Sequence, residues 1–201
     1  MPDIVRDALK YSNGARQVIW SQLKNTPFES NARTSLVLAY LAIALEHQEA
    51  IGRLVDMKLY APAFALLRLQ LEAVFRGLWV NLIASDTDVK AISQDGAEPF
   101  PRFRDMATKL DELYGADGWI ASFIDRWATL NGFTHSGLEQ LGRRFHANGN
   151  IAPNYPDGMI SELVTVSGTL LIGMVMPIFR KMGFDERAKV LDKWLDESVH
   201  T

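Results

Sequence analysis

Apolar residues recur at intervals of three and four along most of this chain, the spacing that places them on one face of an α-helix. Alternation bounded by turn pairs, the signature of β-strands, is absent. The approximate helical segments are 3–24, 31–57, 61–84, 102–114, 118–144, 158–182 and 185–199. We therefore predict an all-α fold, a single up-and-down helical bundle of about six or seven helices that forms one domain over residues 1–201.

Two segments rich in Asp, Asn, Gly and Pro interrupt this periodicity, at residues 85–101 and 146–157. Such composition is typical of turns and loops. We expect both segments to be irregular loops, the first with room for a short helical piece. Loops of this length between helices are either functional or mobile.

Two helical segments are apolar nearly all round. Residues 61–84 have this pattern, which is typical of a helix in the middle of a bundle. Residues 163–179 carry no charged side chain over 17 positions, the lower limit for a membrane-spanning helix. Polar and small residues such as Ser167 and Gly168 favour instead a buried central helix that its neighbours approach closely. We therefore predict no membrane partner.

Composition narrows the classes of function. The formal net charge is -3, from 21 basic and 24 acidic residues, which argues against a general nucleic-acid coat protein. The chain has no cysteine, so disulfides, thiolate nucleophiles and cysteine-ligated zinc are excluded. The start of the chain, residues 1–7, has no basic region followed by an apolar core, so we expect no secretory signal and a cytoplasmic location.

A first polar constellation lies within the apolar segment 61–84. Arg68, Glu72 and Arg76 are four residues apart and so form one stripe on a helix. Buried charges are costly unless they are paired, and Glu72 between two arginines provides such a pairing. The stripe is either a bracing ion-pair network or part of an anion-binding or catalytic cleft, because perturbed charges occur in both.

A second constellation lies in the segment 118–144. Asn131 and His135 are four residues apart, so on a continuous helix they share a face. A histidine can act as a general acid or base near neutral pH. The alternative is a packing histidine whose ring bonds a buried neighbour such as Asn131 or Glu72.

A third set, Glu46, His47 and Glu49, suggests a metal site at first sight, since carboxylates and histidines on helices bind metals in bundles. The spacing is wrong for a Glu-x-x-His pair, because adjacent residues on a helix point about 100° apart. An inward Glu46 that meets Arg68 or Arg76 is the better interpretation. We expect neither a metal nor another cofactor, and phosphate-loop, nucleophile-elbow and His-Glu-x-x-His motifs are absent.

A small basic and aromatic spot occurs near a predicted helix end, where Arg143 and Arg144 precede Phe145 and His146. A second spot of this kind comprises Arg102, Phe103 and Arg104. Together they could contact phosphate or RNA, or they could be ordinary solvated helix ends.

The stretch Leu130-Asn131-Gly132-Phe133-Thr134-His135 resembles the motif of the HEPN (higher eukaryotes and prokaryotes nucleotide-binding) superfamily, helical proteins common in bacterial defence and toxin–antitoxin loci. That motif is Arg, a polar residue, three variable residues and His. Asn131 and His135 match it, whereas Leu130 stands where the family has arginine. The chain also resembles a set of uncharacterised bacterial helical proteins related to that superfamily.

The resemblance implies roles for the candidate site residues. In active members of the superfamily the arginine and histidine carry out metal-independent RNA cleavage. Here His135 would be the acid–base residue, and Arg68 or Arg76 would have to stabilise the charge, since Leu130 cannot. Arg126 lies nine residues from His135, on the opposite helix face. Asn131 and Glu72 would orient the reacting groups.

Two functions follow as expectations. The first is a non-catalytic binding, interaction or regulatory protein of toxin–antitoxin or defence type, which the leucine at position 130 favours. The alternative is a metal-independent endoribonuclease that uses His135 with Arg68 or Arg76. The resemblance implies a homodimer in which two motif helices meet. RNA, a nucleotide and a cognate protein are the other candidate partners.

Overall fold

The computed structural model describes residues 1–93, 100–114 and 119–199, and these ranges form nine helices with one isolated β-bridge. The helices are α1 (Asp3–Leu23), α2 (Ala32–Asp56), α3 (Tyr60–Leu82), α4 (Asp86–Ser93), α5 (Phe103–Tyr114), α6 (Trp119–Thr134), α7 (Leu138–Gly142), α8 (Asp157–Lys181) and α9 (Asp185–Val199). The predicted all-α class is confirmed. The count exceeds six or seven because α4 forms inside a predicted loop and because one predicted helix is divided into α6 and α7.

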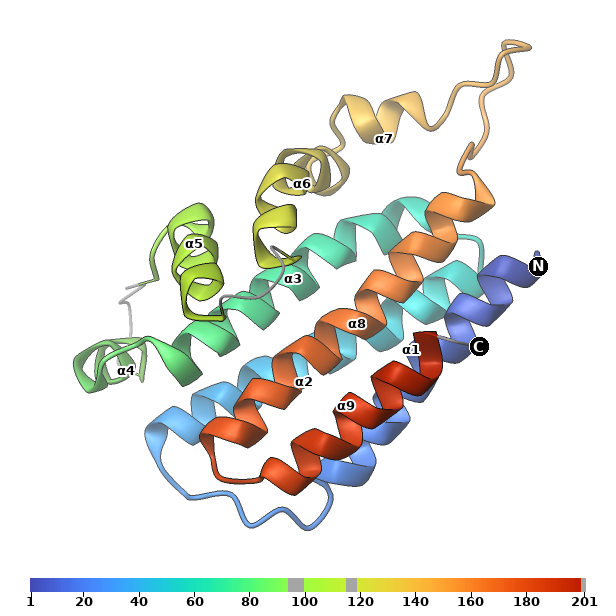
Figure 1. Ribbon diagram of the computed structural model, residues 1–201. Helices are drawn as coiled ribbons and strands as arrows, with labels where there is room; N and C mark the ends of the chain where they lie inside the picture. Colours follow the sequence, from blue (N-terminus) through green and yellow to red (C-terminus); the bar gives the residue numbers. More distant parts are fainter. Residues whose placement is uncertain (94–99, 115–118, 200–201) are drawn as a thin grey trace.

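The helices are arranged as a bundle with a second, smaller group beside it. Figure 1 shows α1, α2, α3, α8 and α9 running along one another, with α5 and α6 on the outer side of α3. The helix α3 therefore lies between the other helices of the bundle and the α5–α6 pair. The short α7 and the segment after it extend away from the bundle at the upper right of Figure 1.

Both segments that were apolar all round become central helices. In α3 the side chains of Leu71, Phe75 and Leu78 are fully buried. The helix α8 is long and apolar enough to cross a membrane by length and composition, but 67% of its most apolar window is buried inside the structure. A core helix passes the same test, so the burial fits the predicted central position.

Glycine and paired polar side chains hold α8 against its neighbours. A Cβ added to Gly168 would lie 2.9 Å from the Cα of Ser12 on α1, so the two backbones approach more closely than any larger residue would allow. The buried Gln70 of α3 donates to the Ser167 carbonyl oxygen at 2.9 Å and accepts from the Ser167 hydroxyl at 2.6 Å. The close approach predicted for this segment is confirmed at Gly168.

The single helix predicted over 118–144 is wrong, because α6 ends at Thr134. Ser136 has a φ of 54°, in the left-handed region that stops a helix, and the Gly137 amide donates to the Gly132 carbonyl oxygen at 2.7 Å. A Cβ at Gly137 would lie 3.0 Å from the Cα of Gly132, so the reversal needs glycine there. After the reversal the chain forms α7.

The segment predicted as a loop after residue 145 contains a narrow hairpin. Phe145 and Ile151 form an antiparallel bridge, and the Ala152 amide donates to the Arg144 carbonyl oxygen at 2.9 Å. We refer to residues 135–154, which comprise the turn, α7 and this hairpin, as the arm.

Parts of two predicted turns lie outside the described residues. These parts are 94–99, within the predicted loop 85–101, and 115–118, the turn before the predicted helix 118–144, where the sequence offers Asp117 as a helix cap.

Candidate functional site

The Arg68, Glu72 and Arg76 stripe forms as the spacing predicts. Glu72 Oε2 lies 3.3 Å from Arg68 Nη1, and Glu72 Oε1 lies 2.8 Å from Arg76 Nη2. One carboxylate thus bridges two guanidinium groups on successive turns of α3. The side chains are 18%, 28% and 26% exposed in sequence order, so the network is only partly screened by solvent.

Asn131 joins the network from α6. Arg68 Nε donates a hydrogen bond to Asn131 Oδ1. Arg68 therefore uses two of its three nitrogens on protein partners, one on its own helix and one on α6. This link between residues 63 positions apart in the sequence ties α6 to α3.

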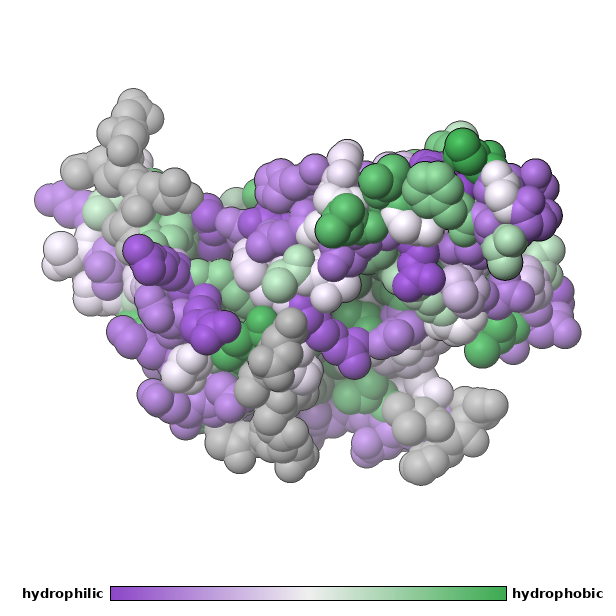
Figure 2. All heavy atoms as spheres, turned by 90° about the horizontal axis from the view of Figure 1, so that it is seen from above, coloured by the Kyte–Doolittle hydropathy of each residue, from purple (hydrophilic) through white to green (hydrophobic). Residues whose placement is uncertain are grey.

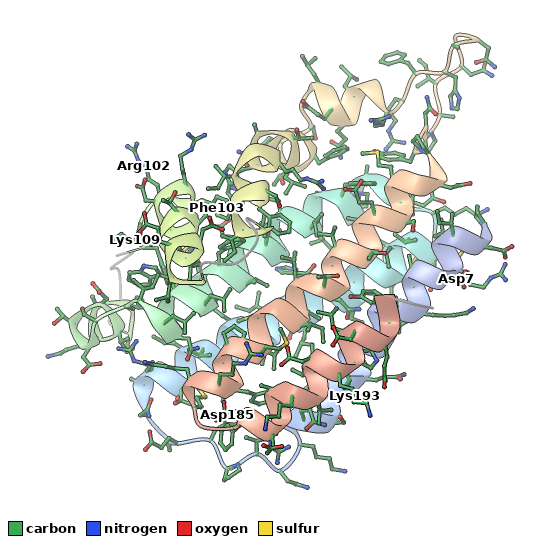
Figure 3. The ribbon with its side chains drawn as sticks, in the orientation of Figure 1. Asp7, Arg102, Phe103, Lys109, Asp185 and Lys193 are labelled. Carbon is green, nitrogen blue, oxygen red and sulfur yellow. The ribbon has the colours of Figure 1, made fainter. Side chains whose placement is uncertain are left out.

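Aromatic rings close the network on the α6 side. The guanidinium carbon of Arg68 lies 4.5 Å from the ring centre of Trp127, a cation–π contact. Phe103 of α5 stacks on the same tryptophan with ring centres 3.6 Å apart, and its ring also meets Phe75 of α3 edge-on at 5.0 Å. Figure 3 labels Phe103 beside α6 and Arg102 at the outer end of α5.

The second arginine has an aromatic neighbour of its own. The Arg76 guanidinium lies 4.7 Å from the ring centre of Phe100. That ring meets Trp79 and Tyr40 edge-on at 5.5 and 5.9 Å. The two cations are thus each placed against a ring that is itself packed on other rings. Among the described residues, the cluster thus places one carboxylate between two guanidinium groups that are braced by aromatic rings.

His135 does not join this cluster. The residue lies in the turn after α6, its backbone amide donates to the Asn131 carbonyl oxygen at 3.0 Å, and its side chain is exposed. Within residues 1–93, 100–114 and 119–199 the ring makes no hydrogen bond or ion pair. The structure therefore brings together four of the five predicted site residues and leaves the imidazole outside their hydrogen-bond network.

Leu130, the residue before Asn131, packs away from the cluster. Leu130 is 8% exposed and lines an apolar groove between α6 and α8 with Leu163 and Val166. Its side chain thus packs toward α8, whereas its neighbour Asn131 bonds to α3. Arg126 lies at the rim of this groove, where it forms an exposed ion pair of 2.5 Å with Glu162.

The inward position predicted for Glu46 is wrong. Glu46 is exposed, and Arg68 and Arg76 have Glu72 as their carboxylate partner. Burial lowers the pKa of the neighbouring His47, with Glu46 acting in the opposite direction. In the part of the chain that the structure describes, no three His, Asp or Glu residues are grouped as metal ligands.

Glu49, the last member of that set, forms ion pairs with two arginines. Arg16 of α1 lies 2.9 Å from Glu49 Oε2, and Arg53 lies 2.6 Å from Oε1. The hydrogen bond from Arg53 and the charge of Arg16 lower the pKa of this carboxyl. The group is a partly exposed ion-pair network between α1 and α2.

The two basic and aromatic spots do not form one surface. Phe103 is packed in the ring stack with Trp127, and α5 lies on the side of α6 away from the hairpin in Figure 1. The spot in the hairpin, with Arg143, Arg144 and the exposed Phe145, therefore stands alone.

Sequence reasoning missed the aromatic residues of the site. Trp127 is four residues before Asn131 and therefore shares its helix face, a signal that was available. Phe100 and Phe103 come from a different segment, and only the folded chain brings them beside the arginines.

Comparison with known proteins gives a family but no activity. A family model described as a family of unknown function (DUF6988) matches residues 41–189, which include α3 to α8 and the whole cluster. No curated protein and no solved structure matches the chain. Since the family model covers well over half of the sequence, the protein belongs to this family of unknown function, DUF6988.

Proposed function

We propose that the protein is a non-catalytic interaction protein that works as a homodimer. We further propose that it is related to the HEPN-like proteins whose motif it resembles. Proteins of that superfamily serve in defence and toxin–antitoxin systems, and the regulatory role that we propose is of that type. The engagement of Arg68 carries the proposal, because Arg68, one of the two cations expected to stabilise a reacting phosphate, is bound to the protein itself.

A catalytic cation must have free hydrogen-bond donors that point at the position where negative charge develops in the transition state. Arg68 instead donates to Asn131 and Glu72 and lies against Trp127, with its side chain only 18% exposed. Hydrogen bonds to charged groups stabilise a fold by about 1.5–3 kcal/mol each. Releasing Arg68 for a substrate would cost that stabilisation, so the cluster serves better as a brace between α3 and α6.

The position of His135 supports the same interpretation. A general base must lie within hydrogen-bond reach of the group that it deprotonates, and its partner groups must be positioned with it. The exposed ring of His135 has no hydrogen-bond partner in the described residues. It lies in the turn that follows α6 rather than on the helix that presents Asn131 to Arg68.

The arm supplies the contact surface. It carries four exposed large apolar side chains, Leu138 at 80%, Leu141 at 52%, Phe145 at 53% and Ile151 at 75%. Figure 2 shows apolar patches in green toward its right side, the side on which the arm lies in Figure 1. Apolar groups gathered on a projecting element mark an interaction site. The arm directly follows the motif helix α6, and the resemblance implies that the motif helices of two copies meet.

Incubation with total RNA in EDTA separates this proposal from its alternative. The wild-type protein and the His135→Ala variant are both expected to leave RNA intact. RNA cleavage by the wild type that the His135→Ala variant lacks would replace the proposal with a metal-independent ribonuclease, the second function that the sequence motif allows.

The molar mass in solution tests the dimer. Light scattering coupled to size-exclusion chromatography is expected to give twice the 22.5 kDa of one chain. The double variant Leu138→Glu and Leu141→Glu is expected to be monomeric, because charges in an apolar contact oppose association. Leu113→Glu is the matched control, since Leu113 is 57% exposed on α5, outside the arm. A monomeric wild type, or a double variant that stays dimeric, would contradict the proposal.

A further inference from the structure

The root of the arm contains a buried hydroxyl group without a partner. Tyr155 follows the hairpin directly, is 8% exposed, and packs against Phe64 and Tyr60 with ring centres 5.4 and 5.5 Å away. Its hydroxyl is buried and makes no hydrogen bond within the described residues. A buried polar group without a hydrogen bond destabilises a fold by about 1–3 kcal/mol, so the presence of this hydroxyl needs an explanation.

Two arginines lie beside this tyrosine because the hairpin returns the chain to them. The Asn154 amide donates to the Arg143 carbonyl oxygen at 2.8 Å, and the Ala152 amide donates to the Arg144 carbonyl oxygen at 2.9 Å. The residue after Asn154 is Tyr155, so the pairing places all three residues at one end of the hairpin.

The arginines act electrostatically on the hydroxyl. Burial raises the pKa of Tyr155, while the nearby charges of Arg144 and Arg143 oppose that rise. Both arginines are partly buried, and neither side chain has a hydrogen-bond or ion-pair partner in the part of the chain that is described. The acidic residue of α7, Glu139, lies against Gly132 of α6 instead. The end of the hairpin therefore holds two uncompensated positive charges.

We infer that Arg143, Arg144 and the Tyr155 hydroxyl form a binding site for a phosphate group. Guanidinium groups bind phosphate through paired, charge-assisted hydrogen bonds. A phosphate monoester carries close to two negative charges at pH 7, which matches two unpaired arginines better than a single carboxylate does. The bound group accepts from the tyrosine hydroxyl and so supplies the partner that it lacks. The buried hydroxyl is reached when the side chains around it shift on binding.

This inference goes beyond the proposed function, because the site uses polar residues at the root of the arm rather than its exposed apolar side chains. A free phosphate ion and the phosphate of an organic monoester share the required chemistry. The experiment therefore compares inorganic phosphate with glycerol 3-phosphate, at an ionic strength held constant with sodium chloride.

Calorimetric titration of the full chain with each probe tests the site. Saturable binding to the wild type is expected for at least one probe, with the lower dissociation constant identifying the form of phosphate that fits. The double variant Arg143→Gln and Arg144→Gln is expected to show no binding. Tyr155→Phe is expected to bind about tenfold more weakly, the effect of losing one hydrogen bond to a charged group.

Two comparisons keep the result interpretable. Arg126→Gln removes an exposed ion-paired arginine on α6 and is expected to leave the dissociation constant unchanged. In phosphate-free buffer Tyr155→Phe is expected to be at least as stable as the wild type, because it removes an unsatisfied group. No saturable binding by the wild type, or an equal dissociation constant in the double variant, would overturn the inference. Neither result depends on the molar mass of the protein.

Discussion

Arg68 of α3 donates a hydrogen bond to Asn131 of α6, and this contact links two polar residues that the sequence had marked on separate helices. The same arginine pairs with Glu72 and lies over Trp127. The contact is one of those that hold α6 against α3.

A double-mutant cycle measures the strength of this link. Arg68→Met and Asn131→Ala are each expected to lower the free energy of unfolding by about 2 kcal/mol, since each leaves a partner unsatisfied. The double variant should cost at least 1 kcal/mol less than the sum, because the residues share one interaction. Urea unfolding followed by circular dichroism gives all four values.

Arg126 and Glu162 provide the matched control for that cycle. Their ion pair also joins α6 to another helix, but the side chains are 57% and 55% exposed. Exposed pairs contribute about 0–1 kcal/mol, so Arg126→Met should change stability little. Additive effects at Arg68 and Asn131 would show that the two residues do not act together.

The site was predictable from the sequence up to the faces of single helices. The spacing of Arg68, Glu72 and Arg76 correctly predicted one paired stripe. The sequence pattern did not reveal that α6 ends at Thr134, because the reversal depends on the left-handed Ser136 and on the close contact between Gly132 and Gly137. His135 lies just before that reversal, where its ring is exposed.

The contact between α1 and α8 is sensitive to a single methyl group. Gly168→Ala is expected to lower the free energy of unfolding by about 1–3 kcal/mol, the usual cost of overpacking, because the added Cβ would lie 2.9 Å from the backbone of Ser12. Thermal unfolding followed by circular dichroism measures the loss.

Gly158→Ala is the control in the same helix. A Cβ at Gly158 would meet nothing within 4 Å, so the gain in helix propensity should leave the protein as stable as before or more so. If both alanine variants were equally stable, the close approach at Gly168 would not be a constraint on the fold.

His47 gives the stability a pH dependence. Burial lowers the pKa of this histidine below its ordinary value of 6.5, so the unfolded chain takes up its proton first as the pH falls. The stabilisation is complete above pH 6.5 and declines as the pH falls from 6.5 toward the lower folded value. Urea unfolding of the wild type between pH 7.5 and 5.5 should show this decline.

The variant His47→Gln separates this histidine from other titrating groups. It should flatten the decline between pH 7.5 and 5.5. The lowered pKa of Glu49 makes stability depend on pH only below about pH 4.5, the ordinary pKa of this carboxyl. That pH lies below the measured range. An unchanged slope in His47→Gln would assign the pH dependence to other residues.

The fold was predictable where apolar periodicity alone decides the structure. The bounds of α1 and α3 lie within two residues of the predicted ones, and the charge-free stretch 163–179 lies in the buried α8. The placement of α5 and α6 was not predictable, because it depends on the stacking of Phe103 on Trp127 between segments with no shared pattern. The helix α4 is the short helical piece for which the predicted loop 85–101 had room, but its bounds could not be predicted from the composition.

Hydrogen exchange by mass spectrometry on Asn131→Ala tests most directly whether the polar cluster is a brace that holds α6 and the arm on α3. We predict faster exchange in residues 120–134 and in the arm, with protection of α1 and α8 unchanged, because local opening follows the loss of local contacts. Unchanged exchange in α6, or equal acceleration along the whole chain, would contradict that role for the cluster.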